Sequence, residues 1–256
     1  MRAAWMTALL WFLFGGTHVL LSMRAPRKRL VARLGETGFI AFYSAVALAT
    51  FAALVHYVAL HRFEGPKGWL LPTIPPVSGA LIVVSVLGLT LFIAGELLYT
   101  QLPMAVFGHR SVRPRGIQQV TRHPGFAGIA IWAGAHCLLS VHPVGFVFFV
   151  GFVVLALLGS LHQDRRLMKE MGAPYREYVA VTSFLPFLAV LRGKQKLRLR
   201  EQPWWAYGLG LAASLALRKL HAHIFDFGGL WIILGFAVGS VVAMLNSRSR
   251  AKHRDP

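Results

Sequence analysis

Acidic residues and cysteine are scarce in this 256-residue chain. It holds 9 aspartates and glutamates against 27 lysines and arginines, and its single cysteine is Cys137. One cysteine excludes an internal disulfide. Charged residues of both signs make up only 14% of the chain, whereas 56% of it is hydrophobic. Because a soluble protein of this size needs far more polar surface, the composition indicates a membrane protein.

Several catalytic signatures are also missing from the sequence. It contains no H-E-x-x-H, G-x-S-x-G, Walker or G-x-G-x-x-G motif. These absences disfavour zinc hydrolases, acyl-transfer enzymes, nucleotide hydrolases and Rossmann dehydrogenases. The chain also has no C-x-x-C-H, which excludes covalent attachment of haem.

Seven apolar segments have the composition of membrane-crossing helices and predict an all-α, polytopic transmembrane bundle. They cover residues 3–22, 39–60, 79–100, 125–140, 144–161, 204–217 and 228–245. The first lacks a signal-peptide cleavage site, so we interpret it as a retained span. The sixth is short, which makes a bundle of six spans the alternative. We predict one membrane domain over residues 1–247 and a basic cytoplasmic tail over residues 248–256.

The net charge of +18 is distributed unevenly between the two sides of the predicted bundle. The first, third and fifth loops and the C-terminal tail hold 22 lysines and arginines, whereas the N-terminus and the other loops hold 5. The positive-inside rule therefore predicts an outer N-terminus and a cytoplasmic C-terminus. The same rule accounts for the excess of basic residues, so nucleic acid is not needed as a partner to explain the net charge. We expect the lipid bilayer as the partner, and a bacterial inner membrane as the location.

This orientation brings ionisable groups from separate spans to a similar depth near the cytoplasmic face. They are His18, Glu96, Tyr99, His123 and His162. Polar groups inside membrane spans often line a site or cavity. The structural alternatives are a core histidine bonded to a carbonyl, an ion pair for Glu96, a helix start at His123 and an interfacial position for His162. Two neutral imidazoles from different helices can bind the iron of haem b.

Motif residues follow one another through most of the chain in a specific order. In the central part they are Gly116-Ile117, Thr121-Arg122-His123-Pro124, Gly128, Trp132, Ala135-His136, His162-x-Asp164-Arg165-Arg166-Leu167, Gly172 and Thr182-Ser183-x-x-Pro186-Phe187. Near the N-terminus they are His18, Arg24 and Gly35-Glu36. This order resembles the NnrU/15-cis-ζ-carotene isomerase family.

The resemblance implies an integral membrane protein that binds haem b, with His18 and His162 as the axial ligands of the iron. One branch of the family isomerises a cis double bond of ζ-carotene, and the bacterial NnrU branch is linked to denitrification. We therefore expect isomerase-like chemistry on an apolar polyene, or an accessory role in denitrification. The isomerase branch has a cysteine near its second ligand, whereas this chain has Gly159-Ser160-Leu161.

We assign roles to the remaining site residues on the same resemblance. Arg122, His123 and Arg165 are expected to contact the haem propionates. The predicted catalytic residues are Glu96, Arg122, His123 and Asp164, with Glu96 and Tyr99 handling protons or supporting the site.

A second, shorter pattern covers about 70 residues. Its members are Arg122-His123-Pro124-Gly125-Phe126-x-Gly128, Asp164-Arg165, Gly172-x-x-Tyr175-x-x-Tyr178 and Pro186. It is similar to isoprenylcysteine and phospholipid methyltransferases, which bind S-adenosylmethionine, although Arg165 replaces the second glutamate of their acidic pair. Methyl transfer is therefore the alternative function.

Overall fold

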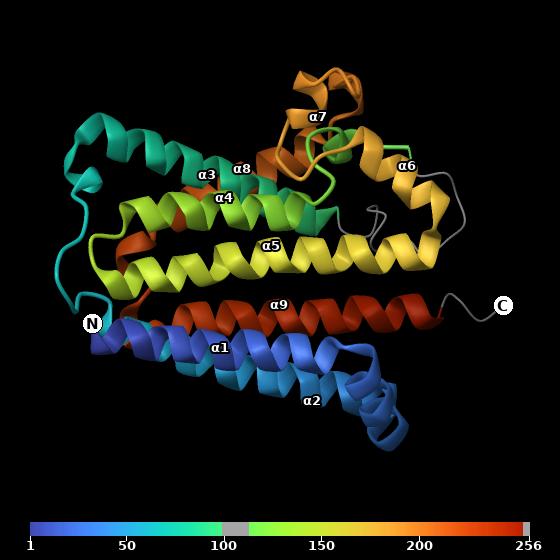
Figure 1. The fold of residues 1–256 in the computed structure, drawn as a ribbon. Helices are drawn as coiled ribbons and strands as arrows, with labels where there is room; N and C mark the ends of the chain where they lie inside the picture. Colours follow the sequence, from blue (N-terminus) through green and yellow to red (C-terminus); the bar gives the residue numbers. More distant parts are fainter. Residues whose placement is uncertain (99–112, 253–256) are drawn as a thin grey trace. The chain divides into compact units, whose positions relative to one another are not determined.

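The computed structural model describes residues 1–98 and 113–252, and every regular element within them is helical (Figure 1). This confirms the predicted fold class for the described residues. The α-helices are α1 (Arg2–Ser22), α2 (Arg24–His61), α3 (Pro75–Leu97), α4 (Pro124–Leu139), α5 (Pro143–Met171), α6 (Ala173–Val181), α7 (Leu188–Leu191), α8 (Trp204–Lys219) and α9 (Asp226–Lys252). The 3-10 helices are η1 (Leu71–Thr73), η3 (Gly116–Gln119), η4 (Leu199–Glu201) and η5 (His221–His223).

Four of these helices are long and apolar enough to cross a membrane. They cover Arg2–Ser22, Ala25–His61, Pro75–Leu97 and Pro143–Met171. Two shorter apolar helices cover Pro124–Leu139 and Asp226–Gly239. In the described part of the predicted spans, all residues except Leu98 and Ser140 lie on a helix, and the end of the predicted third span lies outside the described residues. The count of seven spans and the orientation of the termini stay predictions.

Contacts between backbone segments divide the chain into two compact units. Unit 1 comprises Met1–Gly68, His142–Phe148 and Leu220–Pro256, and unit 2 comprises Trp69–Val141 and Phe149–Lys219. Helix α5 therefore contributes its first turns to unit 1 and the rest to unit 2. The single domain predicted over residues 1–247 stays a prediction.

Unit 1 is built from α1, α2 and α9, and an aromatic cluster fills its interior. The ring of Phe14 lies 5.3 Å from that of Phe51, which in turn lies 4.4 Å from that of Phe236. Helix α2 is interrupted at Gly35, whose φ of 71° is accessible to glycine at little cost. The interruption separates a basic stretch from the apolar span that we predicted to begin at residue 39.

In unit 2 helix α3 packs along both α4 and α8 (Figure 1). Glycines permit close contact between the backbones of α3 and α4. A Cβ atom on Gly88 would lie 2.6 Å from the backbone nitrogen of Trp132, and a Cβ atom on Gly95 would lie 2.7 Å from the backbone nitrogen of Gly125. Pro124 begins α4, where the absence of an N–H group costs nothing. This packing fixes the first turn of α4, which carries the predicted site motif.

Two helices extend past their predicted ends. Helix α5 continues from the predicted end at residue 161 to Met171, because its charged extension contains good helix formers such as Arg165 and Lys169. Helix α9 continues to Lys252, so residues 248–252 of the predicted tail are helical. The extension of α5 is the more important one for function, since it carries Asp164.

Candidate functional site

A buried carboxylate, that of Asp164, lies at the centre of a hydrogen-bonded cluster in unit 2. Its Oδ2 accepts hydrogen bonds from Arg122 Nε at 3.0 Å and Arg122 Nη2 at 2.8 Å. Its Oδ1 accepts hydrogen bonds from His123 Nε2 at 2.7 Å and from the Tyr175 hydroxyl at 2.6 Å. A paired guanidinium donor and two further donors are what a buried carboxylate needs to remain charged. We call these four residues the Asp164 cluster.

Backbone pairing between two distant segments holds the motif loop in place. The Arg122 nitrogen donates to the Ser183 carbonyl at 2.9 Å, and the Phe187 nitrogen donates to the Val120 carbonyl at 2.8 Å. The hydroxyl of Thr121 donates to the Phe184 carbonyl at 2.7 Å. These bonds attach the residues before α4 to the segment after α6. Arg122 and His123 therefore have a fixed position from which to contact α5.

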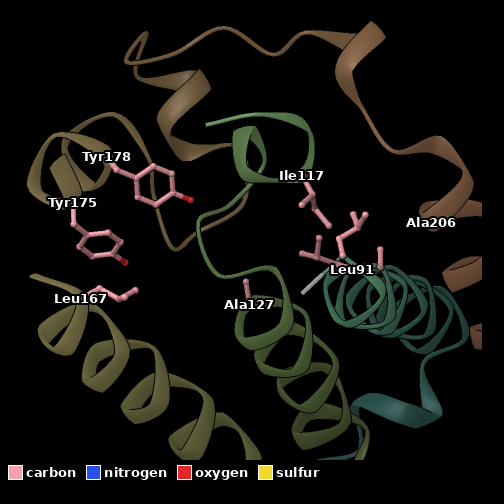
Figure 2. Close-up of a cluster of buried hydrophobic side chains, with 9 residues drawn as sticks. Leu91, Ile117, Ala127, Leu167, Tyr175, Tyr178 and Ala206 are labelled. Atoms are coloured by element: carbon pink, nitrogen blue, oxygen red, sulfur yellow. The ribbon is translucent and has the colours of Figure 1, made fainter. Parts of the chain in front are cut away.

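Helix α6 supplies two buried tyrosines to the same region. Spacing of three residues places Tyr175 and Tyr178 on one face of the helix, with ring centroids 5.6 Å apart. Both hydroxyls point away from α6, toward the side on which α4 and η3 lie (Figure 2). Burial raises the pKa of both phenols far above the usual value, and the hydrogen bond to Asp164 also raises the pKa of Tyr175. Both phenols are therefore neutral, and that of Tyr175 donates to Asp164.

Two buried polar atoms in this region have no hydrogen-bond partner among the described residues. They are the hydroxyl oxygen of Tyr178 and Nδ1 of His123. With Nε2 of His123 donating to Asp164, a neutral imidazole presents a lone pair at Nδ1. The rings of Phe126 and Phe184 flank that imidazole, at 6.0 Å and 6.4 Å between centroids. The arrangement can hold and orient a neutral histidine, in the way that carboxylates orient histidines in other sites.

The structure brings together three of the predicted site residues, Arg122, His123 and Asp164. The sequence interpretation missed the role of Tyr175, although the Gly172-x-x-Tyr175-x-x-Tyr178 spacing already placed both tyrosines on one helical face. Glu96 lies elsewhere in unit 2. Its Oε1 would be 2.6 Å from a Cβ atom on Gly125, and it shares no hydrogen bond with the Asp164 cluster. Tyr99 lies outside the described residues.

His18, a predicted axial ligand, lies half-buried in unit 1. The Tyr43 hydroxyl is 2.8 Å from its Nε2 and 3.0 Å from its Nδ1, and the ring of Phe14 lies 5.6 Å away. The hydroxyl thus lies beside the edge of the imidazole that carries both nitrogens. Sequence reasoning did not predict Tyr43 as the partner of His18.

The other predicted ligand, His162, belongs to unit 2 and is exposed, as is Arg165. Because His18 and His162 belong to different units, their pairing as ligands stays a prediction, and so do the propionate contacts of Arg122, His123 and Arg165. Among the described residues, no group of three or more histidine, cysteine, aspartate or glutamate side chains is placed to hold a metal ion. That result leaves ligation of haem by two histidines untested.

Known proteins that are similar to this chain come from the family that the order of the motifs resembles. The chain is 28% identical over 180 residues to the chloroplastic 15-cis-ζ-carotene isomerase of Arabidopsis thaliana, which covers 70% of this chain and 48% of the relative. It is 28% identical over 196 residues to the same isomerase of Zea mays, covering 74% and 51% respectively. The chain thus spans about half the length of these curated relatives.

No solved structure matches the chain. The family model described as NnrU protein matches residues 6–228, a range that includes most of α1, all of α2 to α8 and the whole Asp164 cluster. A match over most of the sequence, together with apolar helices long enough to cross a bilayer, shows that this chain belongs to the NnrU family of membrane proteins.

Proposed function

We propose that the protein is a haem b-dependent membrane isomerase that changes the geometry of a double bond in an extended, apolar polyene. The observation that carries this proposal is membership of the NnrU family, combined with similarity to two 15-cis-ζ-carotene isomerases over 70% and 74% of the chain. The long apolar helices support it, because a polyene dissolves in the lipid that surrounds them. We place the basic loops in the cytoplasm of a bacterial inner membrane.

His18 and His162 are the residues that would hold the iron of haem b in this proposal. When bound, the haem iron would supply a centre that can interact with a conjugated double bond. Its oxidation state would decide whether that centre is electron-rich or electron-poor. His18 can offer a ring nitrogen only after the Tyr43 hydroxyl moves away from one of the two nitrogens. His162 is exposed and needs no such rearrangement of a described partner.

The Asp164 cluster has a positioning role in this proposal. Since both oxygens of Asp164 already accept hydrogen bonds, Asp164 holds Arg122 and His123 in place and does not take a proton from a substrate. Among the described residues Arg122 bonds Asp164 through Nε and Nη2, which leaves Nη1 for an anionic group such as a carboxylate of the cofactor. Glu96, on α3 beside Gly125 in the first turn of α4, is the remaining candidate for proton transfer.

An absorption spectrum of the purified protein, combined with a cell-based isomerisation assay, tests the proposal. Protein expressed with ample haem should show a Soret band, and His18→Ala or His162→Ala should weaken it severalfold. His223→Ala is the matched control, because His223 is exposed and pairs only with Asp226 among the described residues. In a host that accumulates 15-cis-ζ-carotene, the wild type should convert this isomer and the two ligand variants should not.

The possible outcomes distinguish the alternatives. Protein without a Soret band would refute the cofactor assignment. A Soret band without isomerisation would instead favour an accessory role, including one in denitrification. Binding of S-adenosylmethionine that is lost in Arg122→Ala would favour the methyltransferase alternative.

A further inference from the structure

A cavity of about 340 Å³ lies between the segment before η3 and the chain that follows α7. Five of its lining residues are cationic, namely Arg113, Arg115, Lys194, Lys196 and Arg198. We call it the cationic pocket. Its volume is within the range of small-molecule sites, and its residues lie outside the Asp164 cluster.

Few negative charges compensate these cations. Glu201 is a carboxylate near these cations, and both of its oxygens already accept hydrogen bonds. Its Oε1 accepts from Arg198 Nη1 at 2.9 Å, and its Oε2 accepts from Gln119 Nε2 at 2.7 Å. Arg113, Arg115, Lys194 and Lys196 form no ion pair with a carboxylate of the described residues. Four cations in one cavity without an ion-pair partner among the described residues create a field that attracts anions.

The backbone that carries these cations is fixed by a buried amide. Gln119 is 3% exposed, and its Oε1 accepts from the Arg198 nitrogen at 2.8 Å. The backbone carbonyl oxygen of Gln119 accepts a hydrogen bond from Gln195 Nε2 at 2.8 Å. Gln202 Nε2 also donates to the side-chain Oε1 of Gln119, at 3.1 Å. These bonds connect η3 to the 195–202 segment at several points. Both groups of cations therefore belong to segments that are bonded to one another and line one preformed cavity.

Large apolar side chains close in sequence to the lining residues of the cationic pocket are exposed. Leu191 is 81% exposed, and Leu199 and Trp204 are each 60% exposed. The indole N–H of Trp204 donates to the Leu199 carbonyl at 3.0 Å, which holds the ring beside η4. Exposed leucine and tryptophan beside lysine and arginine are typical of segments that lie at the surface of a bilayer, with basic groups at the level of the phosphates.

We propose that the cationic pocket binds the phosphate group of an anionic phospholipid headgroup. The phosphate occupies the cavity between the arginines before η3 and the lysines after α7, and the acyl chains extend over Leu191, Leu199 and Trp204. Several cations from two segments of the chain suit a phosphate, which presents oxygens in several directions, better than they suit a single carboxylate. This inference does not depend on haem binding or on isomerase activity.

Calorimetric titration of the full-length protein in a nonionic detergent tests the proposal. The probes are short-chain phosphatidylglycerol, phosphatidylcholine of the same chain length and glycerol 3-phosphate. The pocket variant is Lys194→Gln with Lys196→Gln, and the control is Lys28→Gln with Arg29→Gln, which removes the same charge from another exposed basic segment. Thermal unfolding of each variant should match the wild type, because all four side chains are exposed.

We expect phosphatidylglycerol to bind with an affinity that falls about 30-fold in the pocket variant, or about fivefold for each lost charge, and less than threefold in the control. Phosphatidylcholine should bind far more weakly. If glycerol 3-phosphate binds as tightly as phosphatidylglycerol and is lost in the same variant, the phosphate site is supported and its ligand is a soluble phosphate ester. The proposal would be overturned if both double variants lost affinity for phosphatidylglycerol to the same extent. Equal affinity of the wild type for phosphatidylglycerol and phosphatidylcholine would also overturn it.

Discussion

The two tyrosines of α6 show how differently similar buried side chains can be used. The hydroxyl of Tyr175 donates to a carboxylate that also accepts bonds from Arg122 and His123. The hydroxyl of Tyr178 is as deeply buried and has no partner among the described residues. A hydrogen bond to a charged group stabilises a fold, whereas a buried hydroxyl without a partner costs free energy.

These two residues provide a matched pair of substitutions. We expect Tyr175→Phe to lower the free energy of unfolding by about 2 kcal/mol, because it removes a bond to a charged acceptor. Tyr178→Phe should leave the free energy unchanged or raise it by up to about 1 kcal/mol, because it removes only an unsatisfied group. Denaturant titration in detergent would measure both. A loss in Tyr178→Phe equal to that in Tyr175→Phe would show that the Tyr178 hydroxyl has a partner.

At the scale of the helices, the packing of α3 against α4 depends on residues without side chains. A Cβ atom on Gly128 would lie 2.7 Å from the Gly88 carbonyl oxygen and also against the backbone of Phe92. Small residues at such contacts are how helices approach closely in a membrane, where the hydrophobic effect does not drive them together. The contact also fixes the start of α4, and therefore the position of His123.

Helix α4 offers a test of this contact with its own control. Gly128→Ala should lower the free energy of unfolding by about 1–3 kcal/mol, since the added methyl group forces the helices apart. Gly134→Ala, in the same helix, has open space around the new methyl group and should stabilise the protein by up to about 1 kcal/mol. Denaturant unfolding curves of the two variants would measure both changes in the free energy of unfolding. Equal effects would mean that the α3–α4 contact is looser than described.

At the scale of the whole molecule, the distribution of lysine and arginine predicts the orientation in the membrane. The predicted cytoplasmic loops and tail hold 22 of these residues, and the predicted outer segments hold 5. Such a difference is far larger than the positive-inside rule requires. The cationic pocket would then face the anionic cytoplasmic leaflet, which suits a lipid phosphate.

The single native cysteine makes this orientation easy to measure. Cys137 is buried and should react slowly with a membrane-impermeant maleimide. In intact cells we expect Lys67→Cys, in a predicted outer loop, to be labelled rapidly. Lys194→Cys, in a predicted cytoplasmic loop, should be labelled only after the cells are permeabilised. The reverse pattern would contradict the orientation, and wild-type protein measures the background from Cys137.

Part of the site could be predicted from the sequence and part could not. The Arg122-His123-Pro124 motif and Asp164 stand out because charged groups beside apolar segments are rare and costly. Their direct contact was not predictable, since it depends on the rotation of α5 and on a bond between residues 42 positions apart. The partner of His18, Tyr43, was missed for the same reason, because the two lie on different helices.

Composition alone determined that the chain is helical and lies in a membrane, because long apolar runs must satisfy their backbone polar groups within helices in lipid. The order of its motifs was enough to indicate the NnrU family. Only the tertiary structure decided that Asp164 binds Arg122, His123 and Tyr175 together, and that five cations line one cavity. Those arrangements depend on how distant segments fold back onto one another, which local composition and spacing do not specify.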